Sequence, residues 1–382
     1  MRFRLGCILI AAMAAWFAVA TPTAQQAKAP AAPAKKNPFL KLAEPWPEEG
    51  VLQATRTQAD ARRLFRDTEP LAFTLTADFK AINKDRDPES VKRFSGVISV
   101  PGENGAAREL PVRLGTRGHF RLMSRNCDFV PLRVELPRGE SAGTPFDGQT
   151  SLKLGTHCRS DQAYDNYTLR EYLTYRLFNM VTPLSFRARL ARATYVDSGT
   201  KKTVGTRYAI FIEHENEVAR RFGGRIVELP RITFADLDAP TLNRMMLFEY
   251  MIGNTDFSIW ALHNVRIVQD PKRRLYPVPY DFDLSGLVHA PYASPDPRIG
   301  IRSVLDRLYR GPCRSLDEFD ATANAFRGKR ADMLALLDAM RDLAPPARGE
   351  AKEYLEGFFR AVEKPSSVKK QLVDGCKPQP TM

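Results

Sequence analysis

The chain has 382 residues, 43% hydrophobic and 26% charged, and this balance excludes a globally disordered protein and suffices for a sizeable core. Its 57 lysines and arginines outnumber its 44 acidic residues, so the formal charge is +13 at pH 7. Because the basic residues are scattered, with no basic tail, they argue against nucleic-acid binding and favour anionic partners such as phosphates, lipid head groups or envelope polymers.

The N-terminal segment 1–25 has the pattern of a secretory signal peptide. A short basic stretch, MRFR, precedes the apolar run LGCILIAAMAAWFAVA, and cleavage is expected after Ala20 or a few residues later. The run is short for a transmembrane helix, although an uncleaved anchor is the alternative. Segment 26–48, rich in Ala, Pro and Lys, indicates an extended linker. We therefore expect an exported protein, periplasmic or secreted, without a stable transmembrane span after signal cleavage.

Four cysteines remain once Cys7 is removed with the signal peptide. An even number in an oxidising compartment indicates disulfides, and the pairs Cys127–Cys158 and Cys313–Cys376 are favoured because each stays within one half of the chain. Free or buried thiols are the alternative. Zinc is less favoured, since no CxxC or paired histidine spacing accompanies these cysteines.

Alternating apolar residues predict short, mostly antiparallel strands in the region from about Pro70 to Leu136 and just beyond it. The expected strands are 71–79, 94–100, 109–115, 119–123, 131–136 and 151–158.

A helix is expected at 165–181, where leucines recur at helical spacing. Asp165 or Asn166 would cap its start and Pro183 would end it. Segment 188–214 then predicts a hairpin around a polar turn.

The second half has a helical composition. Helices are expected at 239–253, at 316–343 as one or two helices, and at 348–364. The chain is thus expected to divide into a β-rich half, 49–230, with one embedded helix, and a helical half, 231–376. A cleft between two such halves is a natural ligand site.

Two polar segments in apolar surroundings stand early in the second half, GNTDFSIWALHN (253–264) and YDFDLSG (280–286). Asp256 follows a helix end, where an Asx-turn is the alternative to a functional role. Asp281 and Asp283 would face the same side if the preceding strand continued, and with Asn264 they would offer oxygen ligands to Mg²⁺.

The order of these polar residues is the order used in phosphoryl transfer. There, a first Asp orients or deprotonates the acceptor hydroxyl, and an Asn and a later Asp hold Mg²⁺ on the nucleotide phosphates. Positioning and charge neutralisation do most of that chemistry, so few residues are needed.

The region from about Arg113 to Ser294 resembles the spore coat protein H (CotH) kinase-like family. The resemblance is carried by LKLGTHCRSDQAYDNYTLREYLTYRLFN, RARLARATYVDSG with YAIFIEH, GNTDFSIWALHN and VPYDFDLSG. It implies an α+β, two-lobed protein-kinase-like fold, with a β-rich N-terminal lobe containing one embedded helix and a helical C-terminal lobe. It also implies a secreted kinase that uses ATP, or another nucleotide, and Mg²⁺ or Mn²⁺ to phosphorylate a protein or envelope polymer.

By this resemblance Asp256 is the catalytic-loop acid, Asn264 is its metal-binding partner, and Asp281 or Asp283 takes the second metal position. The resemblance also assigns residues to the nucleotide: Glu171 would pair with a nucleotide-binding Lys153, Arg117 would lie near the phosphates, and Glu213 would touch the nucleotide near the lobe junction.

Two departures from the kinase pattern keep other functions open. Asn264 follows Asp256 by eight residues, whereas kinase catalytic loops place it five residues after the Asp. Segment 112–120, VRLGTRGHF, is a poor glycine-rich loop. The alternatives are a non-catalytic, pseudokinase-like envelope scaffold and a hydrolase that uses the carboxylates with a metal-bound water.

Overall fold

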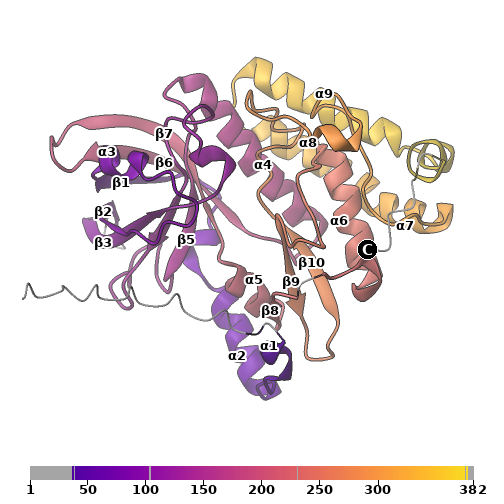
Figure 1. Cartoon of the computed structure of the whole chain (residues 1–382), viewed down its shortest axis with the longest axis horizontal. Helices are drawn as coiled ribbons and strands as arrows, with labels where there is room; N and C mark the ends of the chain where they lie inside the picture. Colours follow the sequence, from indigo (N-terminus) through magenta and orange to yellow (C-terminus); the bar gives the residue numbers. More distant parts are fainter. Residues whose placement is uncertain (1–36, 38, 103–104, 230, 375, 377–382) are drawn as a thin grey trace, which may run out of the picture. The chain divides into compact units, whose positions relative to one another are not determined.

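The computed structural model describes residues 37, 39–102, 105–229, 231–374 and 376, and the predicted signal peptide lies outside them. The described residues from Phe39 onward belong to one compact unit, shown in Figure 1. Among the helices described, none is both long enough and apolar enough to cross a membrane.

A closed β-barrel dominates the first half. Among the described residues its seven strands, in barrel order, are β1 (Leu71–Ala77), β2 (Phe94–Pro101), β3 (Ala107–Thr116), β4 (Leu132–Glu135), β5 (Ser151–Gly155), β7 (Thr203–Ile212) and β6 (Ala188–Asp197). Neighbouring strands are antiparallel except β1 and β6, which pair in parallel from Leu71↔Ala191 to Ala77↔Asp197. This parallel pair closes the barrel.

The barrel is filled by every second residue of its strands. In β1 the burial pattern alternates, and Phe73 and Leu75 point inward with Phe211 of β7 and Tyr195 of β6. Strand side chains alternate between the two faces, so the period-two pattern of the sequence becomes the barrel core.

The first half also contains several short helices. They are α1 (Leu40–Ala43), α2 (Glu49–Asp60), η1 (Arg63–Phe65), α3 (Phe79–Lys84), η2 (Phe120–Leu122) and η3 (Gln162–Tyr164). Helix α2 packs on α5 (Glu215–Arg221), a helix that follows β7.

Helix α4 (Asp165–Val181) lies between the barrel and the C-terminal helices, as Figure 1 shows. It contacts β6 and β7 on one side and α6 and α8 on another, and most of its residues are buried. Its polar residues Glu171 and Arg170 are therefore also inside the molecule.

The second half combines helices with a small sheet. Its elements after α5 are β8 (Arg225–Val227), η4 (Phe234–Asp236), α6 (Ala239–Ile252), β9 (Val265–Gln269), β10 (Leu275–Pro279), η5 (Pro297–Ile299), α7 (Leu316–Arg327), α8 (Arg330–Ala339), α9 (Pro345–Ala361), α10 (Pro365–Val368) and the π-helical η6 (Lys369–Val373). Strands β8, β9 and β10 form an antiparallel sheet in the order β10-β9-β8.

The two-lobed protein-kinase-like fold predicted from the resemblance is wrong, although the α+β class holds. The first half is a closed barrel, because β1 finds a parallel partner in β6. The second half is not a purely helical lobe, since it contains the β8–β10 sheet. One hydrophobic core also joins α4 and the outer faces of β6 and β7 to the C-terminal helices, so the chain has no apolar boundary near residue 230.

Most of the predicted elements form, with two exceptions. Helix α4 has the predicted bounds, and 316–343 contains two helices, α7 and α8. The strand predicted at 119–123 is wrong, because this segment contains the 3-10 helix η2. The predicted N-cap is also wrong: Tyr164 holds that position without a side-chain cap, and Asp165 instead accepts a hydrogen bond from Arg207 Nε at 2.9 Å.

Both predicted disulfides are confirmed among the described cysteines. Cys127 is bonded to Cys158 and Cys313 to Cys376, with Cα atoms 4.6 and 5.7 Å apart. The bonds are compatible with a secreted protein, because disulfides persist in oxidising compartments.

Candidate functional site

The loop after α6 places Asp256 in a fixed polar environment. Helix α6 ends at Gly253, whose left-handed backbone (φ 65°) lies where a Cβ would come within 2.0 Å of the Tyr354 hydroxyl. The Asp256 N–H then donates to Asn254 Oδ1 at 3.0 Å, so the Asx-turn considered for this stretch is formed by Asn254. The carboxylate of Asp256 is left to make other contacts and is about one-third exposed (37%).

Asp256 and Asn264 lie side by side despite their separation in the sequence. Asn264 Nδ2 donates to the Asp256 carbonyl at 2.8 Å and to its Oδ2 at 2.9 Å, and His263 Nε2 lies 3.1 Å from Oδ1. Ser258 and His263 form an isolated antiparallel bridge, which closes the intervening residues into a small turn. The longer spacing thus adds a surface turn and leaves the two polar side chains in contact.

The β9–β10 hairpin brings Asp281 to the same place. Tyr280 N–H donates to the Asn264 carbonyl at 3.0 Å, which aligns the start of β9 with the residue that follows β10. Asn264 (φ 53°) and Asp281 (φ 66°) both have left-handed backbones, which few residue types tolerate. Strand β10 ends at Pro279, so Asp281 and Asp283 do not lie on a continuing strand. Left-handed backbone conformations such as those of Asn264 and Asp281 cost free energy and concentrate at functional sites.

Three carboxylates lie near the end of the β9–β10 hairpin and interact electrostatically. Glu171 of α4 and Asp283 are buried, and Asp281 is about one-third exposed. Burial is the main cause that raises the pKa of both Glu171 and Asp283, and repulsion from neighbouring carboxylates raises it further. Tyr175 of α4 accepts the Asp281 N–H at 3.0 Å, which ties this segment to the helix.

Two arginines and a tyrosine hydroxyl stabilise these carboxylates, the arginines by their charge and the hydroxyl by a hydrogen bond. Arg117 Nη2 lies 3.5 Å from Asp281 Oδ2, and the Tyr292 hydroxyl lies 3.2 Å from Asp283 Oδ2. The Arg121 guanidinium donates to the Thr156 carbonyl and interacts electrostatically with Tyr292 and all three carboxylates, which together raise its pKa against the effect of burial. Its Nε is buried without a hydrogen-bond partner.

Lys153 of β5 lies close enough to Asp281 to interact with it electrostatically. Its Nζ is buried without a hydrogen bond, 4.0 Å from the centre of the Tyr280 ring and 3.5 Å from Glu215 Oε2. Burial, followed by the charge of Arg117, lowers the Lys153 pKa to about 8. An ammonium group with unused donors is costly to bury and is suited to receive an anionic ligand.

Glu171 and Glu213 do not take the contacts implied for them. The ion-pair partner of Lys153 is Glu215 at the start of α5, and Glu171 lies among the carboxylates and Arg121 instead. Glu213 is buried in a bidentate contact with Arg221 and accepts the Arg187 N–H, so its oxygens are already used in joining β6 to α5.

The predicted metal site has the donor types that a hard divalent cation prefers, but the part of the chain that the structure describes does not group them as a metal site. Within the described residues no three His, Cys, Asp or Glu side chains are grouped to hold a metal ion. The predicted ligands are the carboxylates of Asp281 and Asp283 and the amide oxygen of Asn264. The amide nitrogen of Asn264 donates hydrogen bonds to Asp256. Oxygen ligands of this kind suit Mg²⁺ or Mn²⁺.

Another buried acid, Glu249, lies near the loop that follows α6. Glu249 of α6 is buried, and neither of its oxygens has a hydrogen-bond partner in the described part of the chain. Burial raises its pKa to about 8, the Asp256 charge adds to the effect, and the nearby Asn254 side chain and Arg310 oppose it. Asn254 Nδ2 also has no regular hydrogen bond, so its proximity stabilises the charge only in part.

We expect Glu249→Gln to stabilise the protein at pH 8 by roughly 3 kcal/mol relative to wild type and to change little at pH 5. A carboxyl whose pKa is higher in the folded state than in the unfolded state destabilises the protein progressively as the pH rises. For Glu249 this happens between its usual pKa of 4.5 and the folded-state pKa of about 8. The neutral amide removes that loss. Urea unfolding at pH 5, 6.5 and 8 measures it, with the exposed Glu353→Gln as control. Parallel pH profiles for wild type and Glu249→Gln would contradict the assignment.

No protein-family model matches this sequence, and no curated protein matches it significantly. The roles implied by the CotH kinase-like resemblance therefore remain hypotheses, and the functional argument depends on the geometry.

Several residues of the site escaped sequence reasoning. Arg121, Glu215, Tyr175 and Tyr292 reach the site through tertiary contacts, and no motif marks them. His263, which precedes Asn264 in the sequence, also belongs to the site. Its pKa is raised mainly by its hydrogen bond to Asp256.

Proposed function

We propose that this protein is an exported, Mg²⁺- or Mn²⁺-dependent phosphotransferase, periplasmic or secreted, that moves a phosphoryl group from ATP or another nucleotide to a hydroxyl of a protein or envelope polymer. One observation carries the proposal: the buried Lys153 ammonium has no hydrogen bond and lies near Asp281, beside the Asp256–Asn264 pair. The resemblance to the CotH kinase-like family supports the order of site residues and is not extended to the two-lobed fold.

The residues divide into a cationic group for the phosphates and an anionic group for the metal ion. Lys153 and Arg117 would contact the phosphates, and Asp281, Asp283 and Asn264 would hold the metal ion, with Arg117 released from Asp281. A bound divalent cation neutralises charge on the transferred phosphoryl group. Glu213, already saturated by Arg221, has no part in this proposal.

Asp256 is the group suited to the acceptor hydroxyl. Its carboxylate is partly exposed and is held by Asn264 and His263, and a carboxylate has lone pairs beyond those two contacts. Accepting the hydroxyl proton as the new bond to phosphorus forms would make Asp256 the general base.

A non-catalytic envelope scaffold is the second candidate, and a specific observation favours it. The guanidinium groups of Arg117 and Arg121 already compensate the carboxylates, so the cluster is stabilised without a cation. In that case the acidic cluster would join the barrel to α4 and the hairpin, and the nucleotide would have no role.

The thermal midpoint of the mature protein tests the proposal. We expect ATP with Mg²⁺ or Mn²⁺ to raise it, because a ligand that binds only the native state stabilises it by about 2.7 kcal/mol at 100 times its dissociation constant. In Asp281→Asn/Asp283→Asn the metal-dependent part of the shift should vanish. The matched control is Asp317→Asn/Asp332→Asn, which removes two exposed carboxylates of α7 and α8.

The outcomes separate the candidate functions. No shift at millimolar nucleotide and metal would overturn the proposal and favour the scaffold. A shift with metal alone, unchanged by nucleotide, would favour a hydrolase with a metal-bound water.

A further inference from the structure

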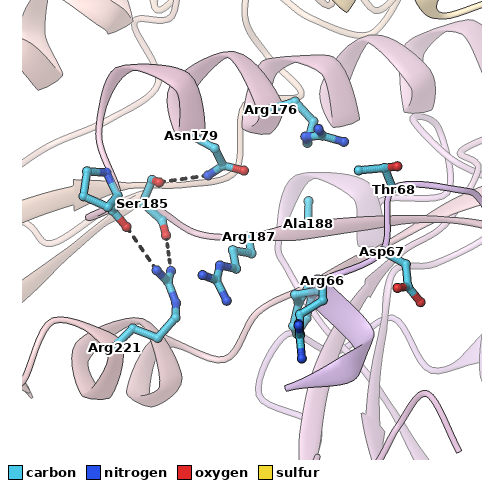
Figure 2. Close-up of a pocket in the computed structure, with 11 residues that line it drawn as sticks. Arg66, Asp67, Thr68, Arg176, Asn179, Ser185, Arg187, Ala188 and Arg221 are labelled. Carbon is cyan, nitrogen blue, oxygen red and sulfur yellow. Dashed lines mark hydrogen bonds between the residues drawn. The ribbon is translucent and has the colours of Figure 1, made fainter. Parts of the chain in front are cut away.

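A cavity of about 330 Å³ lies on another side of α4, and none of its lining residues belongs to the carboxylate cluster. Its walls come from four segments: the turn after η1, helix α4, the connection that leads into β6, and α5 (Figure 2). Four arginines line it, Arg66, Arg176, Arg187 and Arg221.

Two of these arginines are neutralised and two are not. Arg221 is paired with Glu213 and Arg187 with Asp60, while Asp67, the acidic residue of the lining, is paired with Arg189. Among the described residues Arg66 and Arg176 have no carboxylate partner; Arg176 donates to the Tyr172 hydroxyl at 2.7 Å. The lining therefore has a net charge of about +2 from Arg66 and Arg176.

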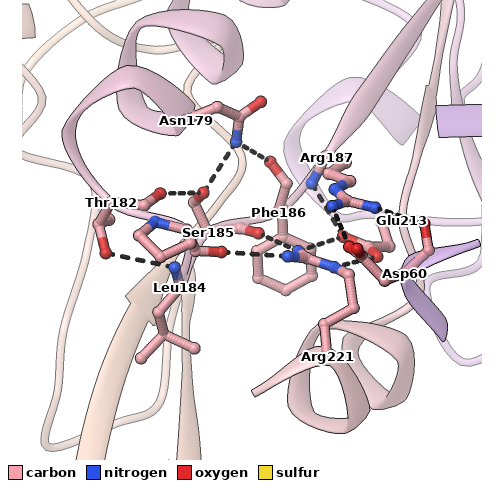
Figure 3. A network of polar contacts seen from close by, with 10 residues as sticks. Asp60, Asn179, Thr182, Leu184, Ser185, Phe186, Arg187, Glu213 and Arg221 are labelled. Atoms are coloured by element: carbon pink, nitrogen blue, oxygen red, sulfur yellow. Dashed lines mark hydrogen bonds and ion pairs between the residues drawn. The ribbon is translucent and has the colours of Figure 1, made fainter. Parts of the chain in front are cut away.

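One of the neutralised arginines, Arg221, belongs to a hydrogen-bond network that fixes one wall of the cavity (Figure 3). Arg221 donates to the Pro183 carbonyl at 3.1 Å and the Ser185 carbonyl at 2.6 Å in addition to Glu213. Asn179 of α4 donates to the Ser185 hydroxyl and to the Phe186 carbonyl, each at 2.8 Å. These bonds hold the cavity in shape before any ligand arrives, which lowers the entropic cost of binding.

The donors without a carboxylate partner suit an anion. Arg66 and Arg176 come from different segments of the lining, and Thr68 lines the same cavity (Figure 2). A guanidinium group presents parallel N–H donors that fit two oxygens of a phosphate, and charge-assisted bonds of this kind are strong.

We propose that this cavity is a second anion site, which binds a phosphate dianion, free or as a phosphate monoester. The net charge of its lining is equal in magnitude and opposite in sign to that of the dianion, and its volume leaves room for a small group attached to the phosphate. A neighbouring hollow of about 300 Å³ shares Pro183, Arg187 and Arg221 with it and would accommodate a larger carrying group. The site does not depend on the phosphotransferase function proposed above.

Isothermal titration of the mature protein with inorganic phosphate and with phosphoserine, without divalent metal, tests the site. We expect binding that persists in Asp281→Asn/Asp283→Asn and weakens at least tenfold in Arg66→Gln/Arg176→Gln. The control Arg138→Gln removes an exposed arginine outside the cavity and should bind as wild type. Tighter binding of phosphoserine would identify a monoester as the ligand, and equal binding would identify free phosphate.

Two results would overturn the proposal. One is the absence of heat with either probe at 10 mM, about the weakest affinity that such a site would show. The other is equal affinity in wild type and Arg66→Gln/Arg176→Gln, which would locate binding elsewhere. An unchanged thermal midpoint of the double variant, measured without ligand, shows that weaker binding does not arise from unfolding.

Discussion

Asp256→Asn is expected to lower the rate of phosphoryl transfer about 1,000-fold while leaving nucleotide binding intact, since a positioned general base contributes of that order. The amide keeps the shape of the carboxylate, but it cannot take the acceptor proton. Asn264 Nδ2 would also face the new amide group, so the variant rotates to present its oxygen. Transfer of labelled phosphate from ATP to water, to the protein itself or to cell-envelope extracts measures the rate.

Two comparisons keep this prediction about Asp256 specific. The thermal shift with ATP and Mg²⁺ should match wild type, because Lys153, Asp281 and Asp283 are unchanged, and Asp317→Asn should retain full activity. A rate within threefold of wild type in Asp256→Asn would contradict its role as the base. That result would not bear on the metal and nucleotide positions, which the thermal shift of Asp281→Asn/Asp283→Asn tests separately.

Arg121→Met is expected to destabilise the fold by about 4 kcal/mol at pH 8, the usual range when removal of one charge leaves buried opposite charges uncompensated. The guanidinium lowers the pKa of both Glu171 and Asp283 against burial and repulsion. Without it, both folded-state pKa values rise further above the usual 4.5 and 3.8. A raised carboxyl pKa removes stability as pH rises above its usual value, so the loss should be largest at pH 8 and small near pH 4.

Urea unfolding across this pH range measures the effect of Arg121→Met. The matched control, Arg125→Met, removes an arginine of the same loop that is exposed. Adding Glu171→Gln to Arg121→Met should recover part of the loss, since one uncompensated carboxyl is then neutral. A loss that is the same at every pH, with no recovery, would show that Arg121 acts through packing alone.

The sequence predicted local structure well because local patterns determine it. The leucine spacing of α4 and the alternation in β1 depend on neighbours in the chain, and both elements form with the expected character. Barrel closure depends on β1 pairing with β6, whose residues are 120 positions later (Leu71↔Ala191), and no period in the sequence records that partnership. The predicted two-lobed fold failed at this point.

The candidate site shows the same division. Asp256, Asn264, Asp281 and Asp283 come together because a short turn and one hairpin link them, and these are near neighbours in sequence. The resemblance implies Glu171 as the partner of Lys153, whereas in this structure Lys153 forms its ion pair with Glu215. The register Lys153↔Ile212 brings β5 beside the end of β7 and so beside Glu215, which sequence spacing cannot show.

The β1–β6 pairing also determines when the barrel can close during synthesis of the chain. Ribosomes produce β1 long before β6, so the five barrel strands that precede β6 keep an open edge until residue 191 or beyond has been synthesised. Exposed strand edges invite pairing between molecules, and distant pairing slows folding. A chain cut short before β6 should therefore aggregate, while one that reaches β7 has every strand that the barrel needs.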